Sequence, residues 1–290
     1  MKPMLAVEAE DFEALTYPLL ASYKLDGIRC LITAEGPRTR SLKPVPNKFI
    51  ASKLSNLPIG LDGELVVLDK NGNVDFRSTT SAVMSHDGEP NFEYRVFDSY
   101  TANGGFLTRS KAALAQLDKL NIPWLIWVPQ ILIMDALGVQ HQFEEAIAGG
   151  YEGLILRDQD APYKHGRSTL KSQWMLKVKP WKDAEATIIG VVEACENTNE
   201  ATTNELGRTQ RSSAKAGKIP KGTLGCLVVT SPKWSQPFEI GTGFDDKEKL
   251  ALWKDKKLIG KLVRFSYVDA GGYDKPRHCS YQGIRDERDI

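Results

Sequence analysis

Six consecutive residues near the N-terminus, Lys24-Leu25-Asp26-Gly27-Ile28-Arg29, combine one nucleophile with two other charged groups. The amine of Lys24 is followed by the Asp26 carboxylate and the Arg29 guanidinium, in a turn that the Asp-Gly dipeptide favours. This arrangement suits a lysine that attacks a phosphate. The same residues also fit a charged surface turn, so the rest of the chain has to decide between the two interpretations.

A lysine nucleophile must lose its proton before it attacks, and the ordinary pKa of lysine is ~10.4. Nearby cations or a divalent metal lower that pKa. Lys177 and Lys179 supply two cations, and alternate residues of a strand point to the same side. Both amines are therefore expected to face one triphosphate.

Glu64 and Glu152 each lie inside an apolar sequence that predicts a strand. A buried carboxylate without a partner is costly. A cationic or hydroxylic group must therefore meet each of them, and a buried ion pair with Arg29 or Arg157 is one such arrangement.

Four further motifs follow KLDGIR in a fixed order: LDGELVV (61–67), YRVFD (94–98), EGLILR (152–157) and MLKVKP (175–180). Together the five motifs resemble those of the covalent nucleotidyltransferases, which include ATP-dependent DNA ligases, RNA ligases and mRNA capping enzymes. Residues 163–190 resemble most specifically the compact, two-domain ATP-dependent DNA ligases of phages and large DNA viruses. The resemblance covers nearly the whole chain and is weakest before Ala21 and after Gly260.

The resemblance implies a set of roles in binding and activating ATP. Lys24 would become covalently adenylylated, and Lys177 and Lys179 would contact the α-phosphate. Glu64 would lie near the ribose and the catalytic metal, and Glu152 would have a metal-directed role. The metal would be Mg²⁺, with Mn²⁺ as the alternative.

The resemblance also implies contacts to adenine and to the nick. Phe97 would stack on the adenine ring, although plain core packing also fits its spacing. Arg29 and Arg40 would hold the ribose and the nick phosphate, and Lys164 and Arg167 would engage the 5′-phosphate of the nick.

Near the C-terminus, residues 274–285 depart from the R-x-D-K form of larger ligases and capping enzymes and look more like the viral and phage variant. Arg277 or Arg285 would orient the pyrophosphate leaving group. Both arginines also fit as surface residues of the last strand, and the two interpretations stay open.

The net charge of +1 hides two basic segments. Residues 164–182 contain six Lys or Arg and no acidic residue, and residues 205–222 contain five basic residues and one Glu. Such strips are the expected footprint of a polyphosphate backbone. The second lies in a polar insert at about 196–222, which is too long for a simple turn. We predict a segment that is mobile in the free protein and clamps DNA through Arg208, Arg211, Lys215, Lys218 and Lys221, with an inert loop as the alternative.

The expected fold class is α+β, with an antiparallel-sheet nucleotidyltransferase domain at 1–180 and an all-β OB-fold domain at 181–290. The domain boundary is expected at about 180–183. Helices are predicted from Ser110 to Leu120, from Gln142 to Ala148 and from Asp246 to Trp253. The segments LDGELVVL and EGLILR are predicted strands, and short apolar strands separated by Gly-rich turns after Pro180 predict the barrel.

The predicted function is an ATP-dependent DNA ligase that seals nicks in duplex DNA, as replication, repair and recombination require. An RNA ligase, an mRNA capping guanylyltransferase or a non-catalytic OB-fold nucleic-acid-binding module are the alternatives. The sequence shows no membrane segment or signal peptide, and its four cysteines form no CxxC pair. We expect a cytoplasmic monomer, in the host cytoplasm if the chain is viral. No separate N-terminal DNA-binding domain is expected, because Lys24 lies close to the start.

Overall fold

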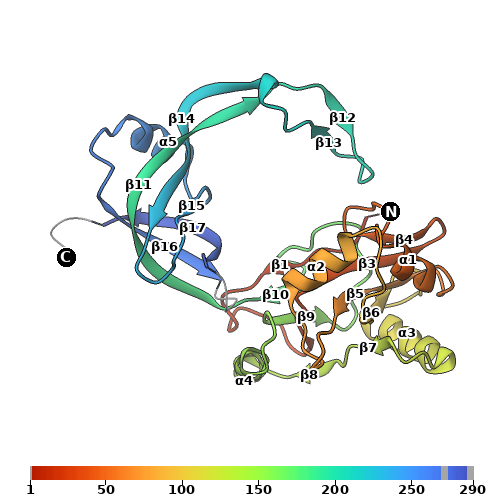
Figure 1. Cartoon of the computed structure of the whole chain (residues 1–290). Helices are drawn as coiled ribbons and strands as arrows, with labels where there is room; N and C mark the ends of the chain where they lie inside the picture. The colour runs from red at the N-terminus through yellow and green to blue at the C-terminus, as the bar shows by residue number, and fades with distance from the viewer. Residues whose placement is uncertain (1, 269–273, 286–290) are drawn as a thin grey trace. The chain divides into compact units, whose positions relative to one another are not determined.

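The computed structural model describes residues 2–268 and 274–285. By contacts, the chain divides into one unit at Met1–Lys179 and a second at Pro180–Ile290, and each is considered by itself (Figure 1). None of the helices in the described ranges has the length and apolar character needed to cross a membrane.

The first unit contains two five-stranded sheets, each antiparallel except for one parallel pair. The first sheet has the order β1 (Val7–Glu8), β10 (Leu176–Val178), β9 (Leu154–Asp158), β2 (Leu19–Tyr23) and β8 (Ile131–Ile133). The second has the order β4 (Gly36–Thr39), β3 (Ile28–Thr33), β5 (Leu61–Val67), β6 (Phe92–Ser99) and β7 (Leu125–Trp127). Four helices complete the unit: α1 (Lys48–Leu54), α2 (Phe76–Met84), α3 (Phe106–Leu120) and α4 (Ala136–Ala148).

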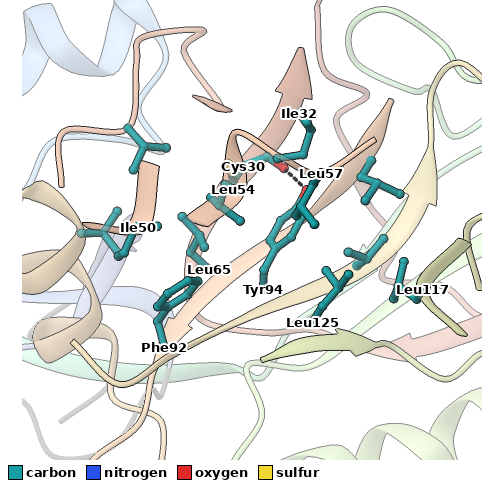
Figure 2. Close-up of a cluster of buried hydrophobic side chains, with 14 of the residues drawn as sticks. Cys30, Ile32, Ile50, Leu54, Leu57, Leu65, Phe92, Tyr94, Leu117 and Leu125 are labelled. Atoms are coloured by element: carbon teal, nitrogen blue, oxygen red, sulfur yellow. Dashed lines mark hydrogen bonds between the residues drawn. The ribbon is translucent and has the colours of Figure 1, made fainter. Parts of the chain in front are cut away.

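Alternation along the strands gives the second sheet one apolar face. On β6, Phe92, Tyr94 and Val96 are buried, whereas the residues between them are only partly buried. Figure 2 shows Phe92 and Tyr94 packed with residues of α1, α3 and neighbouring strands, and Val96 belongs to the same buried cluster. The buried Tyr94 hydroxyl donates a hydrogen bond to the carbonyl oxygen of Cys30 at 3.0 Å, so its polar group is satisfied. The other face of β6, which carries Phe97, is left for the chemistry described below.

Two predicted helix starts are wrong. α3 begins at Phe106 rather than at Ser110, and Gly105 is its N-cap. Ser110 is buried inside the helix, where its hydroxyl donates to the Leu107 carbonyl rather than capping the helix. The first turn is fixed by Arg109, which bonds to Asp98 of β6, a tertiary interaction that the local sequence does not reveal.

α4 begins at Ala136, six residues before the predicted start at Gln142. Asp135 is its N-cap, and the Asp135 side chain accepts a hydrogen bond from the Gly138 amide at 2.8 Å. The predicted end at Ala148 is confirmed, with Gly149 at the C-cap. In the second unit α5 (Asp246–Lys254) begins at the predicted residue, behind a capping box formed by Asp245 and Glu248.

The second unit is built on a five-stranded antiparallel sheet around its own apolar core. Its strand order is β15 (Phe238–Ile240), β14 (Lys218–Thr230), β11 (Trp181–Asn197), β16 (Leu262–Val268) and β17 (Arg277–Ile284). The amide of Tyr281 on β17 donates to the carbonyl of Thr242, just beyond β15, at 2.8 Å. The two edges of the sheet are therefore linked.

The polar insert is not a plain loop. β11 and β14 continue side by side as far as the Asn197–Lys218 pair, and the chain between them forms a hairpin of β12 (Ala201–Thr203) and β13 (Thr209–Arg211), followed by the 3-10 turn η1 (Lys215–Gly217) (Figure 1). The Asn199 side chain donates to the Ser212 and Ala214 carbonyls at 3.1 and 2.9 Å. Side-chain-to-backbone bonds thus replace an apolar core here, and the predicted mobility of the whole insert stays a prediction.

Candidate active site

Strand pairing brings Lys24 and Glu152 together. β2 and β9 are antiparallel partners, and their ladder continues past Tyr23. The Lys24 amide donates to the Gly153 carbonyl at 2.8 Å, and the Glu152 amide donates to the Lys24 carbonyl at 3.0 Å. The nucleophile predicted from KLDGIR therefore lies directly beside the glutamate of EGLILR.

The neighbouring strand adds the second lysine. β10 pairs with the other edge of β9, with Val178 opposite Leu154, so Lys179 emerges next to Glu152. One oxygen of Glu152 forms an ion pair with Lys24 and the other with Lys179. Lys24 keeps 21% of its side-chain surface exposed, whereas Lys179 keeps 9%. The result is one carboxylate between two amines, with Lys24 the more accessible amine.

Two glycines of the motifs permit this close packing. A Cβ on Gly27 would lie 2.4 Å from the Leu65 carbonyl oxygen and 2.8 Å from Cγ of Glu64. A Cβ on Gly153 would lie 2.0 Å from the Val178 carbonyl oxygen, and Gly153 has a φ of +138°. A side chain at either position would push apart the strands that carry the charged groups.

The charges of this cluster stabilise one another. Burial opposes ionisation of Glu152, but Lys24 and Lys179 outweigh that effect and lower the pKa of Glu152. Burial lowers the pKa of Lys179, and Lys24 and Lys177 act in the same direction against the pull of Glu152. Lys179 is therefore held as a desolvated cation whose proton is less tightly bound than that of an exposed lysine.

Lys177 faces a different carboxylate. Its Nζ lies 2.9 Å from Oε2 of Glu8 on β1, and both side chains are 24% exposed. The structure therefore brings Lys24 and Lys179 together on Glu152, whereas Lys177, two residues before Lys179, pairs with Glu8. Its charge still acts on Lys179.

Glu64 on β5 is a carboxylate in a crowded, acidic setting. Burial raises the pKa of Glu64 to about 7 against the lowering effects of Arg29 and Lys24, and Asp62 and Glu152 raise it further. No cluster of three or more His, Cys, Asp or Glu able to hold a metal occurs within residues 2–268 and 274–285. Mg²⁺ in nucleotide enzymes is commonly held by one or two carboxylates together with substrate phosphates. Glu64 and Glu152 fit that donor set, because the charge of Glu152 raises the pKa of Glu64 and a bound cation would lower it.

Arg29 is held by a partner that the sequence analysis did not identify. Its Nε and Nη2 donate to the two oxygens of buried Asp62, both at 2.6 Å. Although burial disfavours the charge of Arg29, Asp62 raises its pKa. The guanidinium carbon lies 4.8 Å from the centre of the Phe97 ring. Phe97 thus lies beside charged groups and is not part of the apolar core cluster around Phe92 and Tyr94, and its stacking on adenine stays a prediction.

The proposed ion pairs of Glu64 or Glu152 with Arg29 or Arg157 are also not found. Arg157 Nη1 donates to Asp98 at 2.8 Å, and the same carboxylate receives two bonds from Arg109. All three of these side chains are at most 2% exposed. Glu152 pairs with the two lysines instead.

The residues missed at the site are Asp62, Tyr163, Asp98 and Arg109. Asp62 and Asp98 belong to the quoted motifs LDGELVV and YRVFD, and each is a carboxylate inside an apolar strand sequence. The argument that singled out Glu64 and Glu152 applied equally to them. Tyr163 and Arg109 gave no comparable signal.

Models of two known protein domains match this sequence. The model of the ATP dependent DNA ligase domain matches residues 3–179, and the model of the DNA ligase OB-like domain matches residues 217–285. The chain belongs to the ATP-dependent DNA ligase family. The predicted fold class, a nucleotidyltransferase domain followed by an OB domain, is confirmed.

Individual relatives support this membership. A probable DNA ligase of Kineococcus radiotolerans is 31% identical over 205 residues, which are 65% of this chain and 40% of the relative. This chain therefore matches less than half the length of that relative. The Chlorella virus DNA ligase-adenylate structure is 31% identical, with 99% of this chain and 98% of that chain covered and a TM-score of 0.56. A structure of the Lig E DNA ligases is 26% identical, covers 98% of this chain and 99% of its own, and has a TM-score of 0.73.

The three residues of the first unit that were predicted to contact a nick differ in their exposure and contacts. Arg40 is exposed in the turn after β4. Lys164 lies 5.7 Å from the centre of the Trp174 ring, and Arg167 Nη1 donates to the Ala6 carbonyl at 2.7 Å. Part of the Arg167 guanidinium is therefore used to hold the N-terminal segment.

In the OB-like unit, the five basic residues of the insert are all exposed: Arg208, Arg211, Lys215, Lys218 and Lys221. Arg211 also donates to the Asn199 carbonyl and so helps to hold the hairpin. Arg285 forms an ion pair with Glu185 of β11, which favours the surface-residue interpretation of Arg285, and Arg277 begins β17.

Proposed function

We propose that this chain is an ATP-dependent DNA ligase that seals nicks in duplex DNA through an AMP adduct on Lys24. The observation that carries the proposal is the placement of Glu152 between Lys24 and Lys179 at the ends of three adjacent strands. A surface turn would not need a desolvated second lysine and a shared buried carboxylate.

The first step joins Lys24 to AMP. Glu152 holds Lys24 in place, and the proton that Lys24 Nζ must lose passes to water, to which the Lys24 side chain is partly exposed. The neutral amine attacks the α-phosphorus of ATP; the N–P bond forms, and the bond to the pyrophosphate oxygen breaks with its electron pair. Lys179 and Lys177 compensate the negative charge on the α-phosphate oxygens.

The next two steps use the same phosphorus. An oxygen of the 5′-phosphate at the nick attacks it, and the bond to Lys24 breaks. The 3′-hydroxyl then attacks the activated 5′-phosphate, and AMP leaves as the phosphodiester bond forms. Mg²⁺, or Mn²⁺, bound through Glu64 and Glu152 would neutralise developing phosphate charge. Phe97 would stack on adenine, and Arg29 and Arg40 would hold the ribose and the nick phosphate.

We assign ATP chemistry to a domain at 1–180 and part of the grip on DNA to an OB domain at 181–290. Lys164 and Arg167 would engage the 5′-phosphate, and the basic insert at 196–222 would follow the phosphate backbone. We further infer that the protein acts as a monomer in the cytoplasm.

A single labelling experiment tests this function. Purified protein is incubated with α-labelled ATP or α-labelled GTP and Mg²⁺, and nicked duplex DNA or, in a parallel reaction, nicked duplex RNA is then added. We expect label from ATP alone to be retained on the protein and then discharged onto the nick, with a sealed strand as product. Retention from GTP would indicate a capping guanylyltransferase, discharge onto nicked RNA but not DNA would indicate an RNA ligase, and no retained label would indicate a non-catalytic module.

A further inference from the structure

The hydroxyl of Tyr163 occupies a position that the proposed reaction does not explain. It donates a hydrogen bond to Oδ2 of Asp62 at 2.6 Å and accepts one from the amide of Met4 at 3.2 Å. Asp62 in turn holds Arg29 through two bonds of 2.6 Å. Tyr163, Asp62 and Arg29 therefore form one continuous chain of hydrogen bonds that ends 4.8 Å from the Phe97 ring.

The direction of each bond in this chain is fixed. Burial raises the pKa of Tyr163 well above its ordinary value, and the charge of Asp62 adds to that effect. The hydroxyl therefore remains protonated and donates to Asp62 at any working pH. The Asp62 carboxylate is fully buried, so it has no solvent with which to exchange these partners.

The ring of Tyr163 also has neighbours in the same unit. The Arg109 guanidinium lies 5.7 Å from its centre, and the Tyr100 ring lies 5.9 Å away. Tyr163 directly precedes Lys164, in the segment that the Leu5 backbone holds through hydrogen bonds to Gly166 and Ser168. One side chain thus joins the segment with Lys164 to the guanidinium beside Phe97.

We propose that Tyr163 is a positioning residue that acts through Asp62 to fix the orientation of Arg29 toward the bound nucleotide. The proposal rests on the proposed ligase function and deepens it, because it assigns the support of a nucleotide-binding side chain to a residue outside the five motifs. Two of the five N–H groups of Arg29 donate to Asp62, and the other three can donate to a ligand. Without the Tyr163 hydroxyl, Asp62 and Arg29 would still attract each other by charge. The Asp62 carboxylate would lose one of the hydrogen bonds that set its orientation, and with it that of the Arg29 guanidinium.

The test uses Tyr163→Phe, which removes only the hydroxyl, and Tyr100→Phe as the matched control. The Tyr100 hydroxyl donates to a backbone carbonyl, that of Ile32, at 2.8 Å, so the control loses a similar bond in the same neighbourhood. The rate constant of self-adenylylation at saturating ATP and the ATP concentration that gives half that rate are measured for both. Thermal unfolding of both variants is followed, with midpoints expected to fall by similar amounts, about 2 to 4 °C.

For Tyr163→Phe we expect the rate constant to fall about tenfold or more, since a bond to a charged group is removed and small misplacements are costly in the transition state. The half-saturating ATP concentration should change less than about threefold, because most of the ground-state interactions remain. Tyr100→Phe should keep both values. In an Asp62→Asn background, Tyr163→Phe should have little further effect, because the partner through which it acts is already altered.

Equal rates in Tyr163→Phe and Tyr100→Phe, or a Tyr163→Phe effect that is undiminished in the Asp62→Asn background, would overturn the positioning role while leaving the ligase function in place. A wild-type protein that never retains AMP would instead overturn both proposals. The two failures are thus distinguished by the wild-type reaction alone.

Discussion

Replacing Lys24 by alanine separates the chemistry of this lysine from its part in folding. Glu152 has two cationic partners, so it still pairs with Lys179 when Lys24 is removed. We expect Lys24→Ala to cost only about 1 kcal/mol, the scale of a single hydrogen-bonded pair. For a unit of this size that is a fall in unfolding midpoint of about 2 to 4 °C.

Replacing Glu152 by alanine is expected to lower the free energy of unfolding more than replacing Lys24. Glu152→Ala leaves the ammonium groups of Lys24 and Lys179 close together without their shared carboxylate. Removing one partner of a buried ion pair costs about 3 to 5 kcal/mol, and the partial exposure of Lys24 reduces this to about 2 to 4 kcal/mol. The glutamate variant should therefore unfold at a clearly lower temperature than Lys24→Ala.

The chemical assay is formation of the AMP adduct, followed by mass spectrometry and by labelled ATP. Lys24→Ala should form none, yet should still seal a nick that already carries 5′-AMP, because the last step needs no lysine nucleophile. Lys111→Ala, an exposed position of α3, serves as the control and should behave as wild type. A lysine-linked AMP on the Lys24→Ala protein would refute the assignment, and equal destabilisation of the lysine and glutamate variants would refute the shared-carboxylate argument.

Three further outcomes are expected. Lys179→Ala should slow self-adenylylation at least tenfold at limiting Mg²⁺ because charge compensation is removed, and a near-normal adduct yield would show that Lys179 is only structural. Replacing Leu206 to Lys221 by a short Gly-Ser linker should spare the AMP adduct and weaken nick binding. For this variant, the slope of log affinity for nicked DNA against log salt concentration should flatten by about 0.9 for each phosphate that the insert no longer neutralises. An unchanged slope would exclude the clamp. Because burial raises the pKa of Glu64 from 4.5 to about 7, its contribution to stability is present below the unfolded value and lost as the pH rises through about 7. In EDTA, Glu64→Gln should remove about 3 kcal/mol of that pH dependence, as measured by denaturant unfolding at pH 4.5 and pH 8.

The sequence allowed the parts of the fold and site that depend on local pattern to be predicted. Apolar segments bounded by Gly and Asp indicated β5 and β9, and Gly149 marked the end of α4. Lys24 and Lys179 were selected as amines suited to phosphate chemistry and Glu152 as a carboxylate inside an apolar strand sequence, and the structure brings the three side chains together. Their roles remain predictions that the experiments above address.

What could not be predicted depends on interactions between distant parts of the chain. The start of α3 is set by Arg109 meeting Asp98, and not by the capping preference of Ser110. The pairing of Arg29 with Asp62 and the link from Asp62 to Tyr163 join residues 33 and 101 positions apart. Spacing along one sequence carries no information about such pairs.

The basic insert leaves the sheet at the end of β11 and returns to it at the start of β14, and this connection allows the insert to be replaced. β11 and β14 are hydrogen-bonded neighbours up to the pair Asn197 and Lys218, so the chain leaves the sheet and returns to it at positions about 5 Å apart. Closing a longer or shorter segment between two such points changes the free energy only slightly, by about 0.6 kcal/mol for each doubling of length. Segments of other lengths and charges can therefore be grafted between Asn197 and Lys218 while Leu224 and Leu227 stay packed in the core. The charge presented at this end of the sheet is therefore adjustable while the strand pairing of the sheet is unchanged.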